Sequence, residues 1–367
     1  MQSRRACSLL CAALAVAAGL LSSSANAGPI TPGNLVIYRA GTGQAALSAA
    51  GAAVFLDEYT PAGALVQSIP VSSAGASALT TIGTAATEGI ISASQDGTKL
   101  VFGGYRADAG TASPNVAGNN RVVGTVDAGG TVDTSIAVTG ISTAVPRSAT
   151  TVDGTTYYLG TSTNVYYVAA PGPASTATVI DARNSRQVNL AGSVLYASNG
   201  STAITTKVQS YGTLPTGVTV GSPIVTTLIG NAVHGFAVFD LDASVAGVDT
   251  VYALDTVASQ LLKWSFNGTT WTQTGSIASG SAQNLTGASS GGVVGLYMTS
   301  TTKLQTLFDF GGFGGPISGS IADLATAPTN TAFRGLGGFS LVVPEPASAM
   351  LVLTALAWVG IRRRSRS

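Results

Sequence analysis

Residues 88–104 read EGIISASQDGTKLVFGG. A strand of small residues leads into the pair Asp96-Gly97, and a bulkier strand follows and ends at glycine. An Asp-Gly pair between two runs of β-forming residues is typical of a tight hairpin. Residues 145–160, VPRSATTVDGTTYYLG, repeat this order around Asp153-Gly154. The sequence therefore predicts a β-hairpin unit that occurs more than once.

Looser copies of this unit recur through the rest of the chain. The copies start near residues 88, 147, 186, 234 and 284, and are separated by 59, 39, 48 and 50 residues. A period of roughly 40–50 residues is typical of the four-stranded blade of a β-propeller. A β-sandwich or a β-helix fits this spacing less well, because the β-helix repeat is closer to about 20 residues.

Both ends of this repeated region supply strands that can close a ring. Segment 333–339, FRGLGGF, has the pattern of a further innermost strand, but too little chain follows it to finish a blade. Three N-terminal strands, expected at 35–39, 53–59 and 65–70, would complete it. We therefore expect an all-β, six-bladed propeller closed by one C-terminal and three N-terminal strands. Seven blades remain open, because the interval 107–145 is long.

Residues 1–27 have the organisation of a secretory signal peptide. Two arginines precede an apolar run from Leu9 to Leu21, and Ala25-Asn26-Ala27 has the small-x-small pattern that signal peptidase accepts. Cleavage after this pattern makes Gly28 the mature N-terminus. We therefore expect export across the inner membrane.

The C-terminal residues carry a second candidate signal. The triplet Pro344-Glu345-Pro346 precedes an apolar run from Ala347 to Ile361. Proline breaks regular structure, so the triplet should be extended and accessible. The run has 15 residues and would rise only about 22 Å as a helix, which suits a transient anchor better than a permanent span or a core helix with a polar face. The arginines that would hold the end of the chain on the cytoplasmic side are Arg362, Arg363, Arg364 and Arg366.

The order of triplet, apolar segment and arginine cluster resembles the PEP-CTERM sorting signal of Gram-negative bacteria, also known as an ice-binding protein C-terminal domain. The resemblance covers roughly residues 343–366 and implies processing by an exosortase-type transpeptidase. It divides the chain into a signal peptide (1–27), a propeller-like body (28–342) and a sorting signal (343–367). Ice binding has no further support, because the body shows no regular Thr-x-Thr ladder.

The composition of the body limits its chemistry. Cys7 and Cys11 both lie before residue 28, so the mature chain has no thiol for a disulfide, a nucleophile or a metal. Lipid attachment at Cys11 would need a small residue before it, where Leu10 stands. Between Gly28 and Val343 there are 11 basic and 15 acidic residues, a net charge of −4. This balance argues against nucleic acid as a partner, because phosphate binding needs clustered cations.

Known catalytic and metal-binding motifs are absent from the sequence. His234 is the only histidine, so a Ser-His-Asp triad would depend on it. Neither G-x-S-x-G nor H-E-x-x-H occurs, and no P-loop or dinucleotide fingerprint is present. Residues 240–249, DLDASVAGVD, begin like a calcium loop but lack its later glycine and glutamate. We interpret them as a turn capped by aspartates, and expect no catalytic residue, metal or cofactor.

Six polar residues lie at the starts of the expected innermost strands. In a propeller such residues surround one mouth of the central channel. Because arginine binds carboxylates with two parallel hydrogen bonds, this mouth could hold an anionic or sugar-like ligand. The alternative is a wet, polar channel end without a ligand. The six residues are Glu88, Arg147, Arg186, His234, Asn284 and Arg334.

Three functions compete, and the low charge, the lack of thiols and the missing motifs favour the first, which is not an enzyme. The first is a non-enzymatic envelope or matrix protein, exported, transiently anchored in the inner membrane, sorted to the cell surface or the medium and associated with exopolysaccharide. The second is a propeller that binds a carbohydrate or a small anion at the channel mouth. The third is a polysaccharide-acting enzyme that uses His234 as a base and an arginine to stabilise an enolate.

Overall fold

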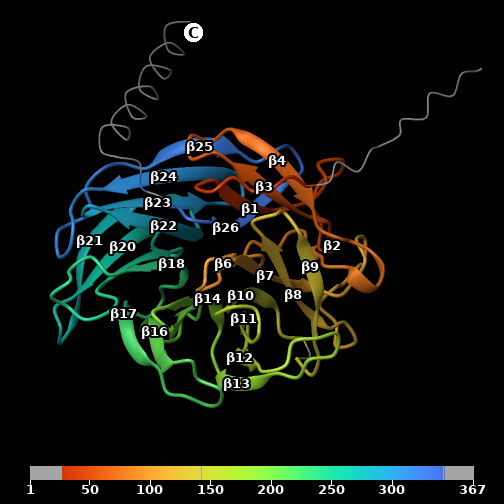
Figure 1. Cartoon of the computed structure of the whole chain (residues 1–367), viewed down its shortest axis with the longest axis horizontal. Helices are drawn as coiled ribbons and strands as arrows, with labels where there is room; N and C mark the ends of the chain where they lie inside the picture. The colour runs from red at the N-terminus through yellow and green to blue at the C-terminus, as the bar shows by residue number, and fades with distance from the viewer. Residues whose placement is uncertain (1–26, 142, 342, 344–367) are drawn as a thin grey trace, which may run out of the picture.

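Six four-stranded antiparallel sheets surround a central axis in the computed structural model, which describes residues 27–141, 143–341 and 343 (Figure 1). In Figure 1 the innermost strands lie near the middle of the view and strands such as β13, β17, β21 and β25 lie at the rim. The prediction of an all-β six-bladed propeller is confirmed. Segment 107–145 adds no seventh blade, because its two strands complete blade 2.

Each blade is named here from its innermost strand outward. Blade 1 consists of β26 (Ala332–Gly337), β1 (Leu35–Ala40), β3 (Val54–Tyr59) and β4 (Leu65–Pro70). Blade 2 consists of β6 (Ser92–Ala93), β7 (Lys99–Tyr105), β8 (Arg121–Asp127) and β9 (Val132–Val138). Blade 3 consists of β10 (Pro146–Thr151), β11 (Tyr157–Thr161), β12 (Val165–Val168) and β13 (Thr178–Asp181).

The remaining blades follow the same order. Blade 4 consists of β14 (Ser185–Ala191), β15 (Val194–Asn199), β16 (Thr206–Thr213) and β17 (Ser222–Thr226). Blade 5 consists of β18 (Val233–Phe239), β19 (Thr250–Asp255), β20 (Gln260–Phe266) and β21 (Trp271–Ala278). Blade 6 consists of β22 (Asn284–Ser290), β23 (Val293–Thr299), β24 (Lys303–Asp309) and β25 (Ala322–Thr326). A small sheet of β2 (Gly51–Ala52) and β5 (Thr81–Ile82) and the 3-10 turn η1 (Gly75–Ser77) lie outside the blades.

The ring closes in blade 1, where the last strand of the body pairs with the first. β26 runs antiparallel to β1, with Val36 opposite Gly337 and Ala40 opposite Ala332. This is the expected closure by one C-terminal and three N-terminal strands. It gives blade 1 four strands like the other five blades and completes the ring, in which the sheet edges are short and protected.

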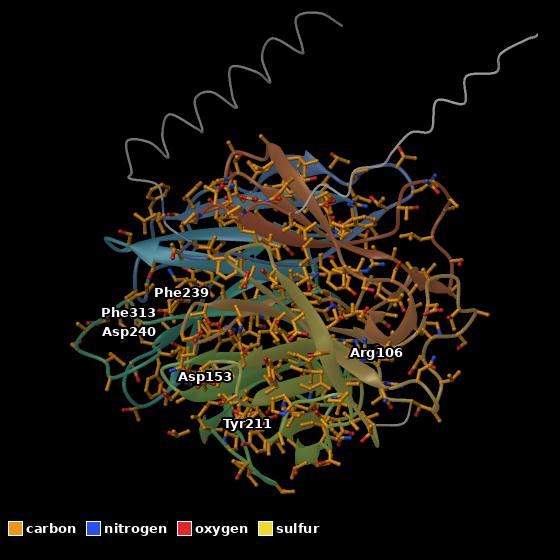
Figure 2. All side chains as sticks on the ribbon, turned by 45° about the vertical axis from the view of Figure 1, so that its right-hand side comes forward. Arg106, Asp153, Tyr211, Phe239, Asp240 and Phe313 are labelled. Carbon is orange, nitrogen blue, oxygen red and sulfur yellow. The ribbon has the colours of Figure 1, made fainter. Side chains whose placement is uncertain are left out.

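Burial falls from the axis to the rim, as the strand sequences require. All residues of β1, β10 and β26 are buried, because neighbouring blades cover both faces of the inner strands. By contrast, β21 at the rim alternates exposed and half-buried residues. Side chains fill the space between the ribbons of the sheets (Figure 2), and the buried apolar ones form clusters that join strands of adjacent blades. Between blades 1 and 2, for example, the ring of Tyr38 meets the ring of Phe102 edge-on at 5.8 Å.

Hydrogen bonds join every pair of adjacent blades near the axis. They tie the inner strands into a ring, so that no blade packs through apolar contacts alone. The bonds are Gly335 N to Gly89 O (3.0 Å), Ile90 N to Arg147 O (2.9 Å), Val188 N to Ser148 Oγ (2.9 Å), Phe236 N to Gln187 Oε1 (2.8 Å), Gly235 N to Gln283 O (2.8 Å) and Phe333 N to Thr301 O (3.0 Å).

The proposed targeting signals fall mainly outside the described residues. Those that lie outside are Ala25, Pro344, Glu345, Pro346, Arg362, Arg363, Arg364 and Arg366. Gly28, at the expected cleavage site, is described, and its main-chain N–H donates to Gln67 Oε1 on β4 at 3.0 Å. Within residues 27–141, 143–341 and 343, no helix has the length and apolar character needed to cross a bilayer.

Candidate functional site

Glu88 lies in the loop before β6 and is buried, with 1% of its surface exposed. Its Oε1 accepts a hydrogen bond from the hydroxyl of Tyr105 at 2.8 Å. Its Oε2 accepts from Thr81 Oγ1 at 2.6 Å and from the main-chain N–H of Ile82 at 2.9 Å. Burial raises the pKa of Glu88, and these hydrogen bonds together with the charge of Arg334 oppose the rise. Both carboxylate oxygens are thus already occupied by the protein.

Two arginines act electrostatically on Glu88, one from the innermost strand of blade 1 and one from that of blade 3. Arg334 of β26 donates through Nη2 to the carbonyl of Gly83 at 2.8 Å and through Nη1 to the carbonyl of Phe333 at 3.2 Å. Its buried Nε has no partner in the part of the chain that the structure describes. Arg147 of β10 has two buried nitrogens, Nε and Nη1, without partners among the described residues. Burial lowers the pKa of both side chains, to about 10 for Arg147, and the charge of Glu88 opposes this. Arg147 therefore remains protonated at neutral pH.

His234, at the start of β18, belongs to the same cluster. Burial, followed by the positive charge of Arg147, lowers the pKa of His234 to about 4. The imidazole is therefore neutral at pH 7. Its main-chain carbonyl accepts a hydrogen bond from Ser198 Oγ at 2.6 Å, which links blade 5 to blade 4.

The other two predicted residues are less closely linked to this cluster. Asn284 is buried at the start of β22, and its Cα lies 2.8 Å from where a Cβ on Gly235 would stand. Arg186 is half-buried and lies against Gly200, and within residues 27–141, 143–341 and 343 its buried Nε and Nη1 have no partner. Among the described residues, no hydrogen bond connects the side chains of Arg186 and Asn284 to those of the other four. What links the other four is charge: Glu88 acts on the pKa values of Arg147 and Arg334, and Arg147 acts on that of His234.

The predicted side chains at this end of the channel are largely shielded from solvent. Five of the six predicted side chains are buried, and Arg186 is half-buried. An unpartnered buried polar group costs about 1–3 kcal/mol, so a cluster of such donors calls for an acceptor. In the described part of the chain, Arg147 and Arg334 leave three guanidinium nitrogens without one. The arrangement suits a small guest that has acceptor atoms and negative charge.

Sequence reasoning missed two residues that support the cluster. Tyr105 ends β7, Arg121 begins β8, and the two are register partners. Arg121 donates to main-chain carbonyls, including that of Ala144 at 2.7 Å, and its guanidinium lies 5.3 Å from the centre of the Tyr105 ring. Arg121 thus has a structural role, whereas Tyr105 holds Glu88. The signal available in the sequence was that a residue with a polar group stands at the end of one strand and at the start of the next.

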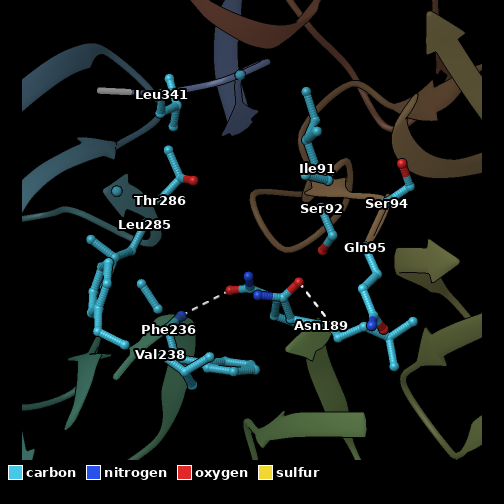
Figure 3. A pocket seen from close by; sticks show the side chains of 17 residues that line it. Ile91, Ser92, Ser94, Gln95, Asn189, Phe236, Val238, Leu285, Thr286 and Leu341 are labelled. Atoms are coloured by element: carbon cyan, nitrogen blue, oxygen red, sulfur yellow. Dashed lines mark hydrogen bonds between the residues drawn. The ribbon is translucent and has the colours of Figure 1, made fainter. Parts of the chain in front are cut away.

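Further along the channel, a cavity of about 300 Å³ is lined by neutral residues (Figure 3). None of the six residues at the strand starts lines it. Gln187 Oε1 accepts from Phe236 N at 2.8 Å and Asn189 Oδ1 accepts from Leu190 N at 3.0 Å, so both amide oxygens are used. Ser92, Ser94 and Thr286 add hydroxyl groups to its lining. The two parts of the channel therefore differ: the first is charged and buried, and the second is neutral and hollow.

The segment 240–249, which begins like a calcium loop, forms the turn between β18 and β19. Asp249 is fully buried, and its two oxygens accept hydrogen bonds from the main-chain N–H of Leu241 (3.0 Å) and Asp242 (2.7 Å) and from Thr250 Oγ1 (2.7 Å). This matches the interpretation as a turn capped by aspartates. Within the described ranges, no three His, Cys, Asp or Glu side chains are grouped so as to hold a metal ion.

Comparisons with known proteins identify the fold and no family. No protein-family model matches the sequence, and no curated protein matches it. A chain of the nidogen/laminin complex matches at a TM-score of 0.50 and 11% identity, over 84% of this chain and 99% of that one. A provisionally named 6-phosphogluconolactonase from Bacteroides uniformis matches at 0.48 and 13% identity (81% and 83% covered). The periplasmic gluconolactonase of Pseudomonas aeruginosa matches at 0.43 and 12% identity (80% and 82% covered). At such identities, the likeness shows the fold alone.

Proposed function

We propose that this protein is an exported propeller that binds a small anion at the start of its channel and catalyses no reaction of its own. One observation carries the proposal: within the described residues, three buried guanidinium nitrogens of Arg147 and Arg334 have no partner, while both oxygens of the nearby carboxylate, Glu88, already accept hydrogen bonds from the protein. Charged hydrogen bonds to a carboxylate are roughly twice as strong as neutral ones, so an anion would satisfy these donors best.

The guest should be small. The unpartnered nitrogens are shielded from solvent, so a whole oligosaccharide cannot reach them without a rearrangement of the strand starts. A carboxylate group matches the planar guanidinium of Arg147. The neutral imidazole of His234 could donate one further hydrogen bond to the same anion. We therefore assign the site to a monocarboxylate or to the carboxylate group of a small sugar acid.

The non-catalytic part of the proposal rests on His234. This side chain is buried, and within the described residues its imidazole has no hydrogen bond to a serine, threonine or carboxylate that it could activate. Nucleophilic catalysis of the Ser-His type needs the nucleophile and its base within hydrogen-bond reach of each other, so no preformed pair of this type supports an enzyme here. The export part rests on the signal-peptide pattern and on the resemblance to PEP-CTERM, which imply an inner-membrane-anchored precursor and then a surface or extracellular product associated with exopolysaccharide.

A thermal-shift titration tests anion binding. Sodium acetate and sodium gluconate, each compared with sodium fluoride at equal ionic strength, should raise the Tm of the wild-type protein. Arg147→Gln should weaken binding at least about tenfold, because it removes the charged fork. Lys303→Gln removes the cation of an exposed pair with Asp323 and serves as the matched control. An equal response of the two variants would refute the proposed site.

Intact mass of the protein from cell-surface and medium fractions tests export and sorting. We expect loss of residues 1–27 and of the segment after Pro344, with the second loss abolished by Glu345→Ala. A product that keeps its C-terminal segment in both cases would refute sorting and leave the anion site to be judged by its own titration.

A further inference from the structure

The neutral cavity of about 300 Å³ lies at the end of the channel opposite the charged cluster (Figure 3). Its lining includes Phe239, the last residue of β18, Gln95, which follows β6, and Gly338, which follows β26. These residues stand where inner strands end, whereas the charged cluster stands where inner strands begin. Blades 2, 4, 5 and 6 and the segment after β26 all contribute to the lining, so the cavity lies on the axis of the ring.

Two amide groups of β14, those of Gln187 and Asn189, present unused donors to this cavity. The two residues stand two positions apart on one strand, so their side chains leave the same face of the sheet. Each amide oxygen accepts a main-chain N–H, which fixes the end of the amide that is nitrogen. Among the described residues, neither nitrogen donates a hydrogen bond, and neither is shielded from solvent, unlike the nitrogens of Arg147. Figure 3 shows the amide of Asn189 near the middle of the cavity.

Hydroxyl groups on other blades supply acceptors to the same cavity. Ser92 Oγ donates to the carbonyl of Val188 at 2.7 Å and keeps its lone pairs for a ligand. Thr286 of β22 is half-buried, and its hydroxyl makes no hydrogen bond within the described part of the chain, so it can donate or accept. The cavity thus combines two amide donors with groups that can also accept.

The charge of the lining selects among ligands. None of the described residues that line the cavity is ionisable, so an anion or a cation would find no counter-charge there. Removal of an unpaired charge from water is costly. An apolar ligand would displace water from the two amide nitrogens without replacing its hydrogen bonds. The class that remains is a small neutral molecule with several oxygen atoms.

We infer that this cavity binds a neutral monosaccharide. Its oxygen atoms accept hydrogen bonds from Gln187 Nε2 and Asn189 Nδ2, and its hydroxyls donate to the Thr286 hydroxyl. The apolar side chains of Leu285 and Leu341 line the cavity as well and offer contacts to the C–H groups of the ring. The volume lies at the lower end of the range of about 300–1,000 Å³ that small-ligand sites occupy, which suits one sugar ring better than an oligosaccharide.

Saturation-transfer NMR and calorimetry with glucose, galactose, mannose and N-acetylglucosamine test the inference on the intact protein. At least one of these sugars should bind with a Kd of about 1 mM or tighter. Cyclohexanol, a ring with one hydroxyl, and glucosamine, a cationic ring, should both bind at least about tenfold more weakly than that sugar. Asn189→Ala removes one amide and should weaken sugar binding about tenfold. Asn164→Ala is the matched control, because Asn164 is also a half-buried asparagine but does not line the cavity.

The inference does not depend on the proposed anion site, and the variants separate the two. Arg147→Gln should keep monosaccharide binding, and Asn189→Ala should keep the Tm response to acetate. If Asn189→Ala fails to fold by circular dichroism, Thr286→Val replaces it, because valine keeps the branched shape and removes the hydroxyl, with a loss of about threefold expected. No binding of any of the four sugars, equal binding by Asn189→Ala and Asn164→Ala, or binding of cyclohexanol as tight as that of the sugars would each overturn the inference.

Discussion

The main-chain N–H of Gly335 donates to the carbonyl oxygen of Gly89 at 3.0 Å. This hydrogen bond joins β26, the innermost strand of blade 1, to the loop that leads into blade 2. A Cβ on Gly335 would lie 2.3 Å from the main-chain nitrogen of Ile91 and 2.4 Å from the Cα of Ile90. Both are backbone atoms and cannot rotate away, so the junction of blades 1 and 2 requires glycine at this position.

Gly335→Ala should lower the free energy of unfolding by about 1–3 kcal/mol or more, because the added methyl group forces two inner strands apart. Urea denaturation followed by tryptophan fluorescence measures this change. Gly118→Ala is the matched control, since a Cβ there meets no atom within 4 Å. Equal stabilities of the two variants would contradict the close approach.

Lys263 and Asp309 form a fully buried ion pair between blades 5 and 6, with Nζ 2.9 Å from Oδ2. Tyr252 also donates to Oδ2 at 2.5 Å, and the main-chain N–H groups of Gly311 and Ser318 donate to Oδ1 at 2.8 Å. Lys263→Met should cost about 3–5 kcal/mol, because it leaves a buried carboxylate without its cation. The double variant Lys263→Met, Asp309→Leu should lose less than the sum of the single losses. Additive losses would show that the pair is not coupled.

The same pair predicts a loss of stability in acid. Burial tends to raise the pKa of Asp309, but the hydrogen bonds from Ser318, Tyr252, Lys263 and Gly311 outweigh it and hold the pKa below its ordinary value of 3.8. A depressed carboxylate pKa stabilises the fold above the unfolded value and ceases to do so as the pH falls through the folded value. Urea midpoints should therefore drop below about pH 4, and Asp309→Asn should show a smaller drop. The same drop in that variant would contradict the assignment.

The lowered pKa of His234 predicts a second effect of pH on stability, at higher pH than that of Asp309. Its pKa is lowered from 6.5 to about 4, so the unfolded chain binds the proton more tightly, and stability should fall as the pH drops from 6.5 towards 4. The difference corresponds to about 3 kcal/mol at most. Glu88, whose pKa burial raises, has the opposite effect, so the informative comparison is with His234→Gln. We expect this variant to show a flatter pH profile of unfolding; an unchanged slope would mean that His234 titrates normally.

From the hydrogen bonds of Asp249 we predict that calcium has no part in the β18–β19 turn. Its oxygens are occupied by main-chain N–H groups and a hydroxyl, so Asp249→Ala should cost about 1–3 kcal/mol and unfold this turn first in hydrogen exchange. Calcium chloride and EDTA should leave the Tm of the wild-type protein unchanged. A Tm that rises with calcium would require ligands that this turn does not offer.

Local pattern was sufficient to predict the blades. The Asp-Gly pairs mark hairpins in which Gly97 and Gly154 have φ of +72° and +92°, a conformation that other residues seldom adopt. The strand expected at 53–59 is β3 at Val54–Tyr59, and the strand expected at 65–70 is β4. Turn chemistry and strand period act over a few residues, so one sequence suffices to read them.

The burial of side chains and their contact partners could not be predicted from local sequence pattern. Glu88 is held by Thr81 and by Tyr105 from β7, and the direction of those side chains depends on how the loop before β6 crosses the strand starts. Lys263 and Asp309 are 46 residues apart and meet only because blades 5 and 6 pack face to face. Such contacts depend on the angle between blades, which sequence period does not encode.

The closure of blade 1 also has a consequence for the order in which the chain is made. Val36 of β1 cannot pair with Gly337 of β26, its register partner, until nearly the whole body has been synthesised. Throughout that time the axis-facing edge of the first sheet has no neighbour, and open edges of this kind invite pairing with other chains. A prematurely ended copy would expose that edge permanently. Arrival of β26 is thus the event that separates a finished molecule from a target for chaperones and proteases.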